Sequence, residues 1–300
     1  MTRPLFVIGS KRSGSTLTVH LLNAHPRVFV THESDIAWLL YQHRNGRPER
    51  VETHPLDSRM MLSQTARVGR RALRRLGDAP DTEAIRSAFF EVQGSLLRKF
   101  VRGQKLPGGG LKPIAEQVGK RPTPRRLWRA LTREREILDK RPDDLAWLGD
   151  KKHAQMLDPD VRAFLTEHFP DARSIHVVRD PRSVLASIQK AEEDWYVKPD
   201  FFGGTAAEIV GHWAEVEERV LAAKEAEAAP ILTVRLEDIW ADPHAETARM
   251  LAFLDLDMDP TVERWIPKLV RARDPNAKYS GADLPDVPRA RALMERYGYA

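Results

Sequence analysis

The chain has 300 residues, of which 42% are hydrophobic and 30% are charged. This composition is that of an ordinary globular protein and excludes collagen, coiled coils and wholesale disorder. No cysteine is present, which excludes disulfide frameworks, thiolate metal sites and cysteine nucleophiles. Lysine and arginine number 48 against 43 acidic residues, and the net charge of +5 favours acidic ligands without the imbalance of a dedicated nucleic-acid binder.

Strands and helices are expected to alternate along most of the chain, because short apolar or β-branched runs alternate with longer amphipathic stretches. The expected strands cover residues 3–9, 28–31, 146–150, 174–178 and 231–235. The expected helices run from residue 15 to His25-Pro26, around 38–41, up to Phe169-Pro170, from Pro181, over 206–228 and from Pro243. This alternation predicts an α/β fold with a central parallel sheet flanked by helices.

Residues 44–144 differ in composition from the rest of the chain, since they are rich in Arg, Pro and Gly. We interpret them as a mostly helical insertion or cap within a single domain. Five arginines within residues 67–75 have helical spacing, which favours a solvated basic face over a site for an acidic substrate or a membrane surface. No apolar stretch reaches the ~18 to 20 residues of a membrane span, and we expect a cytoplasmic protein.

The eight residues from Gly9 to Thr16, GSKRSGST, separate the first strand from the first helix. In this context, backbone N–H groups and the amino end of the helix can bind a phosphate. The glycine spacing is that of a P-loop, yet Ser15 stands where a nucleoside triphosphatase has its lysine. A cation, Arg12, lies inside the loop instead, and no strand end shows an obvious metal-binding aspartate. The loop therefore predicts an anion site that uses arginine and not magnesium.

A second anion site is expected at the end of the strand 174–178. Arg179 follows this strand directly, and Asp180-Pro181 is a typical helix start. Ser183 and Ser187 lie four residues apart and share one face of that helix. Since the carboxyl ends of parallel strands meet at one edge of the sheet, the two sites should fit a nucleotide phosphorylated at both ends.

Together these segments resemble the sulfotransferases that use 3′-phosphoadenylyl sulfate, especially the bacterial group similar to tyrosylprotein sulfotransferase. The loop with Leu21-Leu22-Asn23-Ala24-His25-Pro26 is similar to the family's 5′-phosphosulfate motif, and residues 177–187 are similar to its 3′-phosphate motif. Residues 234–243 resemble a third block, and residues 295–299 resemble the usual chain end. The resemblance implies a P-loop-like three-layer fold and transfer of a sulfuryl group to an acceptor oxygen, or less often nitrogen, which leaves adenosine 3′,5′-bisphosphate.

The resemblance also implies roles for individual residues. Lys11, Arg12, Ser13, Gly14, Ser15 and Thr16 would bind the 5′-phosphosulfate, and Arg179 with Ser187 would bind the 3′-phosphate. Lys151 matches a lysine that stabilises charge on the transferring group, with Lys152 as its competitor. Glu33 matches the catalytic glutamate of the tyrosylprotein branch, and His153 has the spacing of the histidine base in cytosolic sulfotransferases. No metal is implied.

Two other functions stay open on the sequence alone. A P-loop kinase for a small acceptor would also need an anion loop, and it would depend on magnesium. A non-enzymatic module that binds polyanions through the basic residues 70–75 would show salt-sensitive binding without group transfer. The acceptor could be a small molecule, a glycan, a lipid-linked sugar or a peptide, nucleic acid is not expected, and a homodimer is among the assemblies that the sequence allows.

Overall fold

The computed structural model describes residues 2–32, 34–46, 69, 71–105, 140–151, 154–194, 204–226, 229–270 and 283–299. Its centre is a five-stranded sheet in the order β2-β3-β1-β4-β5, and every neighbouring pair is parallel. The strands are β1 (Arg3–Ile8), β2 (Val28–His32), β3 (Trp147–Lys151), β4 (Arg173–Val178) and β5 (Ile231–Arg235). The predicted parallel α/β sheet is therefore confirmed, with its strands within a residue or two of the expected bounds.

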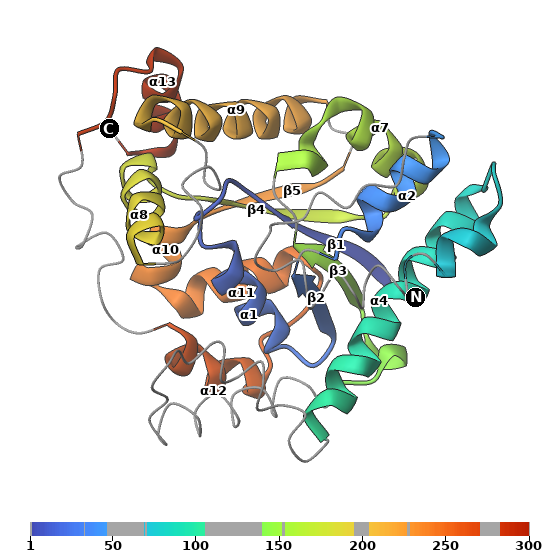
Figure 1. Ribbon diagram of the computed structural model, residues 1–300. Coiled ribbons are helices and arrows are strands. Elements are labelled where there is room, and N and C mark those ends of the chain that lie inside the picture. The colour runs from blue at the N-terminus through green and yellow to red at the C-terminus, as the bar shows by residue number, and fades with distance from the viewer. Residues whose placement is uncertain are drawn as a thin grey trace.

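Helices cover both faces of this sheet (Figure 1). They are α1 (Ser15–Asn23), α2 (Ile36–Arg44), α4 (Thr82–Lys105), α7 (Pro159–His168), α8 (Pro181–Asp194), α9 (Ala206–Glu225), α10 (Leu236–Ala241), α11 (Pro243–Phe253), α12 (Pro260–Leu269) and α13 (Pro288–Tyr297), with short 3₁₀ turns η1 (Pro142–Asp144) and η2 (Ala154–Leu157). Within the described ranges, no helix is both long and apolar enough to span a bilayer.

The alternation of side chains along β1 explains why both faces of the sheet are covered. Leu5 and Val7 pack into a core with α1, α10, α11 and α12, whereas Phe6 and Ile8 pack into a second core with α2, α4, α7 and α9. All four side chains are at most 2% exposed. A strand that is buried on both faces reads as a continuous apolar run, and this is the pattern that residues 5–8 show.

Helix α4 lies inside the 44–144 segment, yet it packs on the sheet. The Phe89 ring on this helix lies 6.0 Å from the ring of Phe6 and 5.2 Å from that of Phe169. Phe89 is fully buried, as are Ile85 and Val92 on the same face of the helix. The segment expected to form a cap therefore contributes one of the helices of the main core.

Loops after the strands meet at one edge of the sheet, because parallel strands end on the same side. Lys151 at the end of β3 is in register with Val7 of β1 and with His32 of β2. Val178, the last residue of β4, is in register with Arg235 of β5. The phosphate loop, the β2–α2 loop and the start of α8 therefore all lie at this edge, as expected for ligand sites in α/β sheets.

Candidate active site

The phosphate loop has a backbone conformation that requires glycine at two positions. Gly9 and Gly14 have φ values of +154° and +96°. A Cβ atom on Gly9 would lie 2.4 Å from the carbonyl oxygen of Val177, and one on Gly14 would lie 2.5 Å from a methyl carbon of Leu236. The loop is thus held tightly between β4 and the start of α10. Arg12, between the two glycines, adopts a left-handed conformation with φ +64°.

The amino end of α1 points its free donors toward this loop. Gly14 occupies the N-cap position, and no side chain caps the helix. Such an end offers backbone N–H groups and a partial positive charge to an anion. The hydroxyl groups of Ser10 and Ser13 are buried and have no hydrogen-bond partner in the described part of the chain. Two orphaned hydroxyls beside an uncapped helix fit a phosphate or phosphosulfate group.

Both predicted anion sites share one cluster of contacts. The Arg12 Nε donates a hydrogen bond of 3.0 Å to the Ser187 hydroxyl, and the Arg179 Nη1 donates one of 3.2 Å to the Arg12 carbonyl oxygen. Arg179 and Ser187 are 7% and 4% exposed. The two arginines, which are 167 residues apart, therefore lie side by side. The contacts thus bring two basic side chains to one edge of the sheet.

Lys151 reaches the same loop from β3. Its Nζ lies 3.5 Å from the hydroxyl of Thr16, at the first turn of α1, and the side chain is buried. A buried ammonium group beside a phosphate loop is suited to neutralise charge that grows on a transferring group. Lys151 therefore lies next to Thr16 of the phosphate loop, and its role in stabilising the transferring group stays a prediction.

Asp150 lies at the same strand end, and its carboxylate binds groups of the protein itself. Its carboxylate is buried and accepts hydrogen bonds from the Thr31 hydroxyl (2.8 Å) and from the backbone N–H groups of Ser34 (2.9 Å) and Asp35 (3.2 Å). Burial raises the pKa of Asp150 to about 6, with a further contribution from the Asp35 carboxylate, while these hydrogen bonds act in the opposite direction. The carboxylate therefore fixes the β2–α2 loop. Across the described residues, no group of three His, Asp or Glu side chains is placed to hold a metal ion.

Three of the predicted catalytic residues lie outside the described residues: Glu33, Lys152 and His153. The choice of base between Glu33 and His153 therefore stays a prediction. The hydrogen bonds from Ser34 and Asp35 to Asp150 nevertheless place the chain on one side of position 33 at the carboxyl edge of the sheet.

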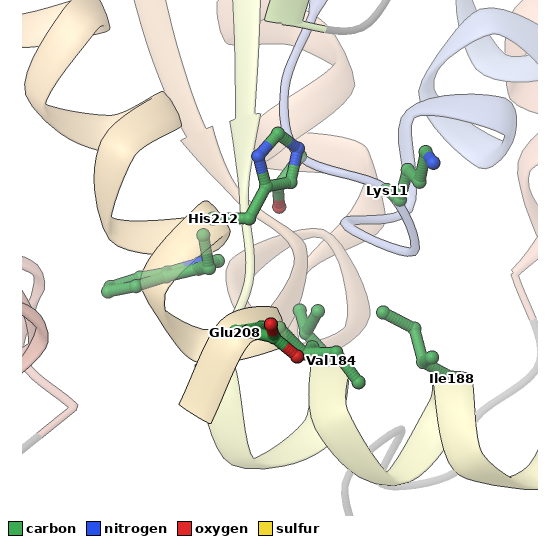
Figure 2. Close-up of a pocket in the computed structure, with 8 residues that line it drawn as sticks. Lys11, Val184, Ile188, Glu208 and His212 are labelled. Atoms are coloured by element: carbon green, nitrogen blue, oxygen red, sulfur yellow. The ribbon is translucent and has the colours of Figure 1, made fainter. Parts of the chain in front are cut away.

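A pocket of about 190 Å³ lies beside the phosphate loop, between α8 and α9. Figure 2 shows Lys11 and His212 on opposite sides of it, with Val184 and Ile188 below. The other lining residues are Ser10, Glu208, Ile209 and Trp213. Partial burial, with a smaller effect of the Lys11 cation, lowers the pKa of His212 despite the opposing charge of Glu215. The pocket has room for a ring or a short chain rather than for a whole nucleotide.

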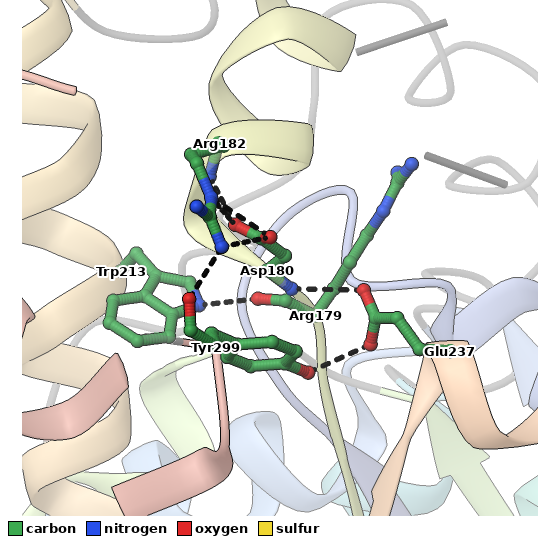
Figure 3. A network of polar contacts seen from close by, with 6 residues as sticks. All are labelled: Arg179, Asp180, Arg182, Trp213, Glu237 and Tyr299. Atoms are coloured by element: carbon green, nitrogen blue, oxygen red, sulfur yellow. Dashed lines mark hydrogen bonds and ion pairs between the residues drawn. The ribbon is translucent and has the colours of Figure 1, made fainter. Parts of the chain in front are cut away.

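The start of α8 is held by a polar network that the sequence analysis did not assign (Figure 3). It consists of Arg179, Asp180, Arg182, Trp213, Glu237 and Tyr299. Glu237 and Tyr299 occur in blocks that resemble the family, but the resemblance gave them no role. The contacts of these two residues join positions 57 to 117 residues apart, which a local sequence pattern does not encode.

The basic residues 67–75 are described in part. Arg71, Arg74 and Arg75 are exposed, and Arg75 forms an ion pair of 3.0 Å with Glu91 of α4. Arg67 and Arg70 lie outside the described residues. An exposed pair of this kind contributes little to stability and does not by itself point to a ligand.

Comparison with known proteins agrees with this geometry. Residues 4–260 match the model of the Sulfotransferase family. The chain is 31% identical over 124 residues to the human carbohydrate sulfotransferase 6, covering 35% of this chain and 30% of that protein. It is 27% identical over 164 residues to the mouse carbohydrate sulfotransferase 5, covering 46% and 40%. The matches thus span less than half the length of these two curated relatives.

Among solved structures, the sulfotransferase domain from the olefin synthase of Synechococcus PCC 7002 has a TM-score of 0.55 at 20% identity, covering 100% of this chain and 96% of that one. At this identity the likeness concerns the fold, and it agrees with the parallel sheet and its flanking helices. Since the family model extends over most of the chain, including both segments predicted to bind anions, the chain belongs to the Sulfotransferase family.

Proposed function

We propose that this protein transfers the sulfuryl group of 3′-phosphoadenylyl sulfate to a hydroxyl group, or less often an amine, of an acceptor. The family generally uses this donor. The observation that carries the proposal is the contact cluster of Arg12, Ser187 and Arg179 next to an uncapped helix end. Two anion sites held together at one sheet edge suit a donor that is charged at both its 5′ and 3′ positions.

In the proposed reaction, some site residues bind the donor and others stabilise the charge that develops during transfer. Arg12 and residues 13–16 would hold the 5′-phosphosulfate, and Arg179 with Ser187 would hold the 3′-phosphate. In an in-line transfer, the acceptor oxygen bonds to sulfur as the bond from sulfur to the donor's phosphate oxygen breaks. Negative charge then grows on the leaving oxygen, where Lys151, Arg12 and the amino end of α1 stabilise it. The proton of the acceptor hydroxyl passes to a base, for which Glu33 and His153 are the candidates.

The apolar part of the acceptor is proposed to enter the pocket between α8 and α9. Ser10 and Lys11 of the phosphate loop line this pocket, and Val184, Ile188 and Ile209 give it apolar walls. A group bound there would therefore lie next to the donor loop. The proposed acceptors are small molecules, glycans, lipid-linked sugars and peptides that carry a nucleophilic oxygen on an apolar ring or chain. A part for residues 44–144 in binding them stays a prediction.

Calorimetry with three ligands tests the proposed donor site: adenosine 3′,5′-bisphosphate, ATP with magnesium, and heparin as a polyanion. We expect strong preference for the bisphosphate. Arg179→Ala should weaken bisphosphate binding by about 10- to 100-fold, since hydrogen bonds to charged groups are worth ~1.5–3 kcal/mol. Preference for ATP with magnesium would favour a kinase, and salt-sensitive heparin binding alone would favour a polyanion module. Incubation of a cell extract with labelled donor would then identify the acceptor.

A further inference from the structure

The peptide group between Arg179 and Asp180 is held from both sides. The carbonyl oxygen of Arg179 accepts a hydrogen bond of 3.1 Å from the indole Nε1 of Trp213. The N–H of Asp180 donates one of 3.1 Å to the Glu237 carboxylate. Figure 3 shows the Arg179 side chain leaving this clamped peptide on the side away from Tyr299. Because both ends of the peptide are bound, the direction in which the Arg179 side chain leaves the backbone is constrained.

Tyr299, next to the end of the chain, holds the Glu237 side of this clamp. Its hydroxyl donates a hydrogen bond of 2.8 Å to the second oxygen of Glu237. Its carbonyl oxygen accepts one from Arg182, whose Nε also donates to the Asp180 carboxylate at 3.0 Å. The guanidinium group of Arg235 lies 4.7 Å from the centre of the Tyr299 ring. Tyr299 therefore contacts α8 directly through its backbone carbonyl and is linked to the start of α8 through Glu237 by its side chain.

The Tyr299 hydroxyl keeps its proton at neutral pH. Tyr299 is 4% exposed. Burial, followed by the neighbouring Glu237 carboxylate, raises the pKa of the Tyr299 phenol. The hydroxyl thus stays protonated and donates to the carboxylate. If the hydroxyl were removed, one oxygen of Glu237 would lose this hydrogen bond, and the carboxylate would be held less firmly against the Asp180 N–H.

We infer that Tyr299 and Glu237 are positioning residues that orient Arg179 for the 3′-phosphate of the donor. This inference rests on the proposed function, since it assigns Arg179 to that phosphate. The C-terminal residues would then set the affinity for one end of the nucleotide only. The 5′ end is bound by the phosphate loop. Arg179 itself donates a hydrogen bond to the Arg12 carbonyl oxygen of that loop, whereas none of the contacts drawn in Figure 3, which hold Arg179 from the other side, includes a loop residue.

The test compares two nucleotides that differ in the 3′-phosphate. Dissociation constants for adenosine 3′,5′-bisphosphate and adenosine 5′-monophosphate are measured for the wild type and for Tyr299→Phe. We expect the variant to bind the bisphosphate about 5- to 10-fold more weakly and the monophosphate within about 2-fold of wild type, as befits loss of one buried hydrogen bond. Tyr297→Phe is the matched control, because it removes a hydroxyl from α13 outside the network, and it should change neither constant.

Glu237 provides a second pair of variants. Glu237→Ala removes both contacts and should lower bisphosphate affinity at least as much as Tyr299→Phe, whereas Glu237→Gln keeps an oxygen for the Asp180 N–H and should restore most of it. Thermal unfolding verifies that each variant is folded. If Tyr299→Phe does not fold, the bisphosphate affinities of the two Glu237 variants test the inference instead.

Three results would overturn the inference. In the first, folded Tyr299→Phe binds the bisphosphate within about 2-fold of wild type. In the second, the variant binds both nucleotides more weakly to the same extent, which indicates a merely structural role. If the wild type itself does not prefer the bisphosphate to the monophosphate, the proposed function fails, and the inference fails with it.

Discussion

Arg12 offers a test that separates the effect of a residue on stability from its effect on activity. Its φ of +64° is costly for a residue with a Cβ, by about 1–2 kcal/mol, whereas glycine adopts this conformation freely. Glycine in turn raises the conformational entropy of the unfolded chain, which offsets roughly 0.5–1 kcal/mol. We therefore expect Arg12→Gly to be about 0.5–1 kcal/mol more stable than Arg12→Ala, which raises its Tm by about 1–2 °C in a chain of this size.

Both variants should lose activity to a similar extent. Each lacks the guanidinium group that donates to Ser187 and that the proposal places on the phosphosulfate. Removal of one such donor costs ~10²- to 10³-fold in turnover, equivalent to ~2.7–4 kcal/mol. Strain at a functional residue persists because the residue is needed for function and not for the fold. The same two proteins thus separate the backbone effect from the chemical one.

The assay combines thermal unfolding with transfer of labelled sulfuryl groups to the acceptor found in the extract experiment. Turnover above about a tenth of the wild-type value in either variant would refute the role of Arg12. A Tm for Arg12→Gly below that of Arg12→Ala would refute the left-handed conformation on which the stability argument depends.

Three further substitutions test the core, the site edge and the pocket. Gly149→Ala should lower the free energy of unfolding by more than ~3 kcal/mol or prevent folding, because its Cβ would lie 1.7 Å from the backbone oxygen of Leu5 in the adjacent strand. The control Gly77→Ala has open space around the added Cβ and should lower that free energy by only ~1 kcal/mol, as measured by urea unfolding. Asp150 has a raised pKa of about 6, so the native state binds more protons than the unfolded state between pH 4 and 6. The free energy of unfolding should therefore fall by about 2–3 kcal/mol as the pH rises through this window. In Asp150→Asn this pH-dependent part should vanish from the unfolding free energy, and an unchanged profile would contradict it. Ile188→Trp should fill the pocket and raise the KM for the acceptor by roughly 10-fold or more while bisphosphate affinity stays the same; an unchanged KM would remove the pocket from the acceptor site.

Local patterns along the chain determined the elements and the anion-binding segments. The apolar run of β1, the glycines of the phosphate loop and the Asp180-Pro181 helix start act through backbone conformation and capping, which depend on residues only a few positions apart. For this reason, the parallel α/β fold and the places of Arg12 and Arg179 followed from the sequence. The resemblance to sulfotransferases pointed to the same segments, because they carry the family's motifs.

Only the tertiary structure decided how these segments meet. The strand order β2-β3-β1-β4-β5, the packing of α4 on the sheet and the hydrogen bond between Arg12 and Ser187, 175 residues apart, depend on how the whole core packs. The link from Tyr299 through Glu237 to Asp180 also depends on the packing of the whole core, since these residues lie just after α13, on α10 and at the start of α8, respectively. A buried carboxylate shows in the sequence as an acidic residue like any other, and its hydrogen-bond donors exist only where the folded backbone places them.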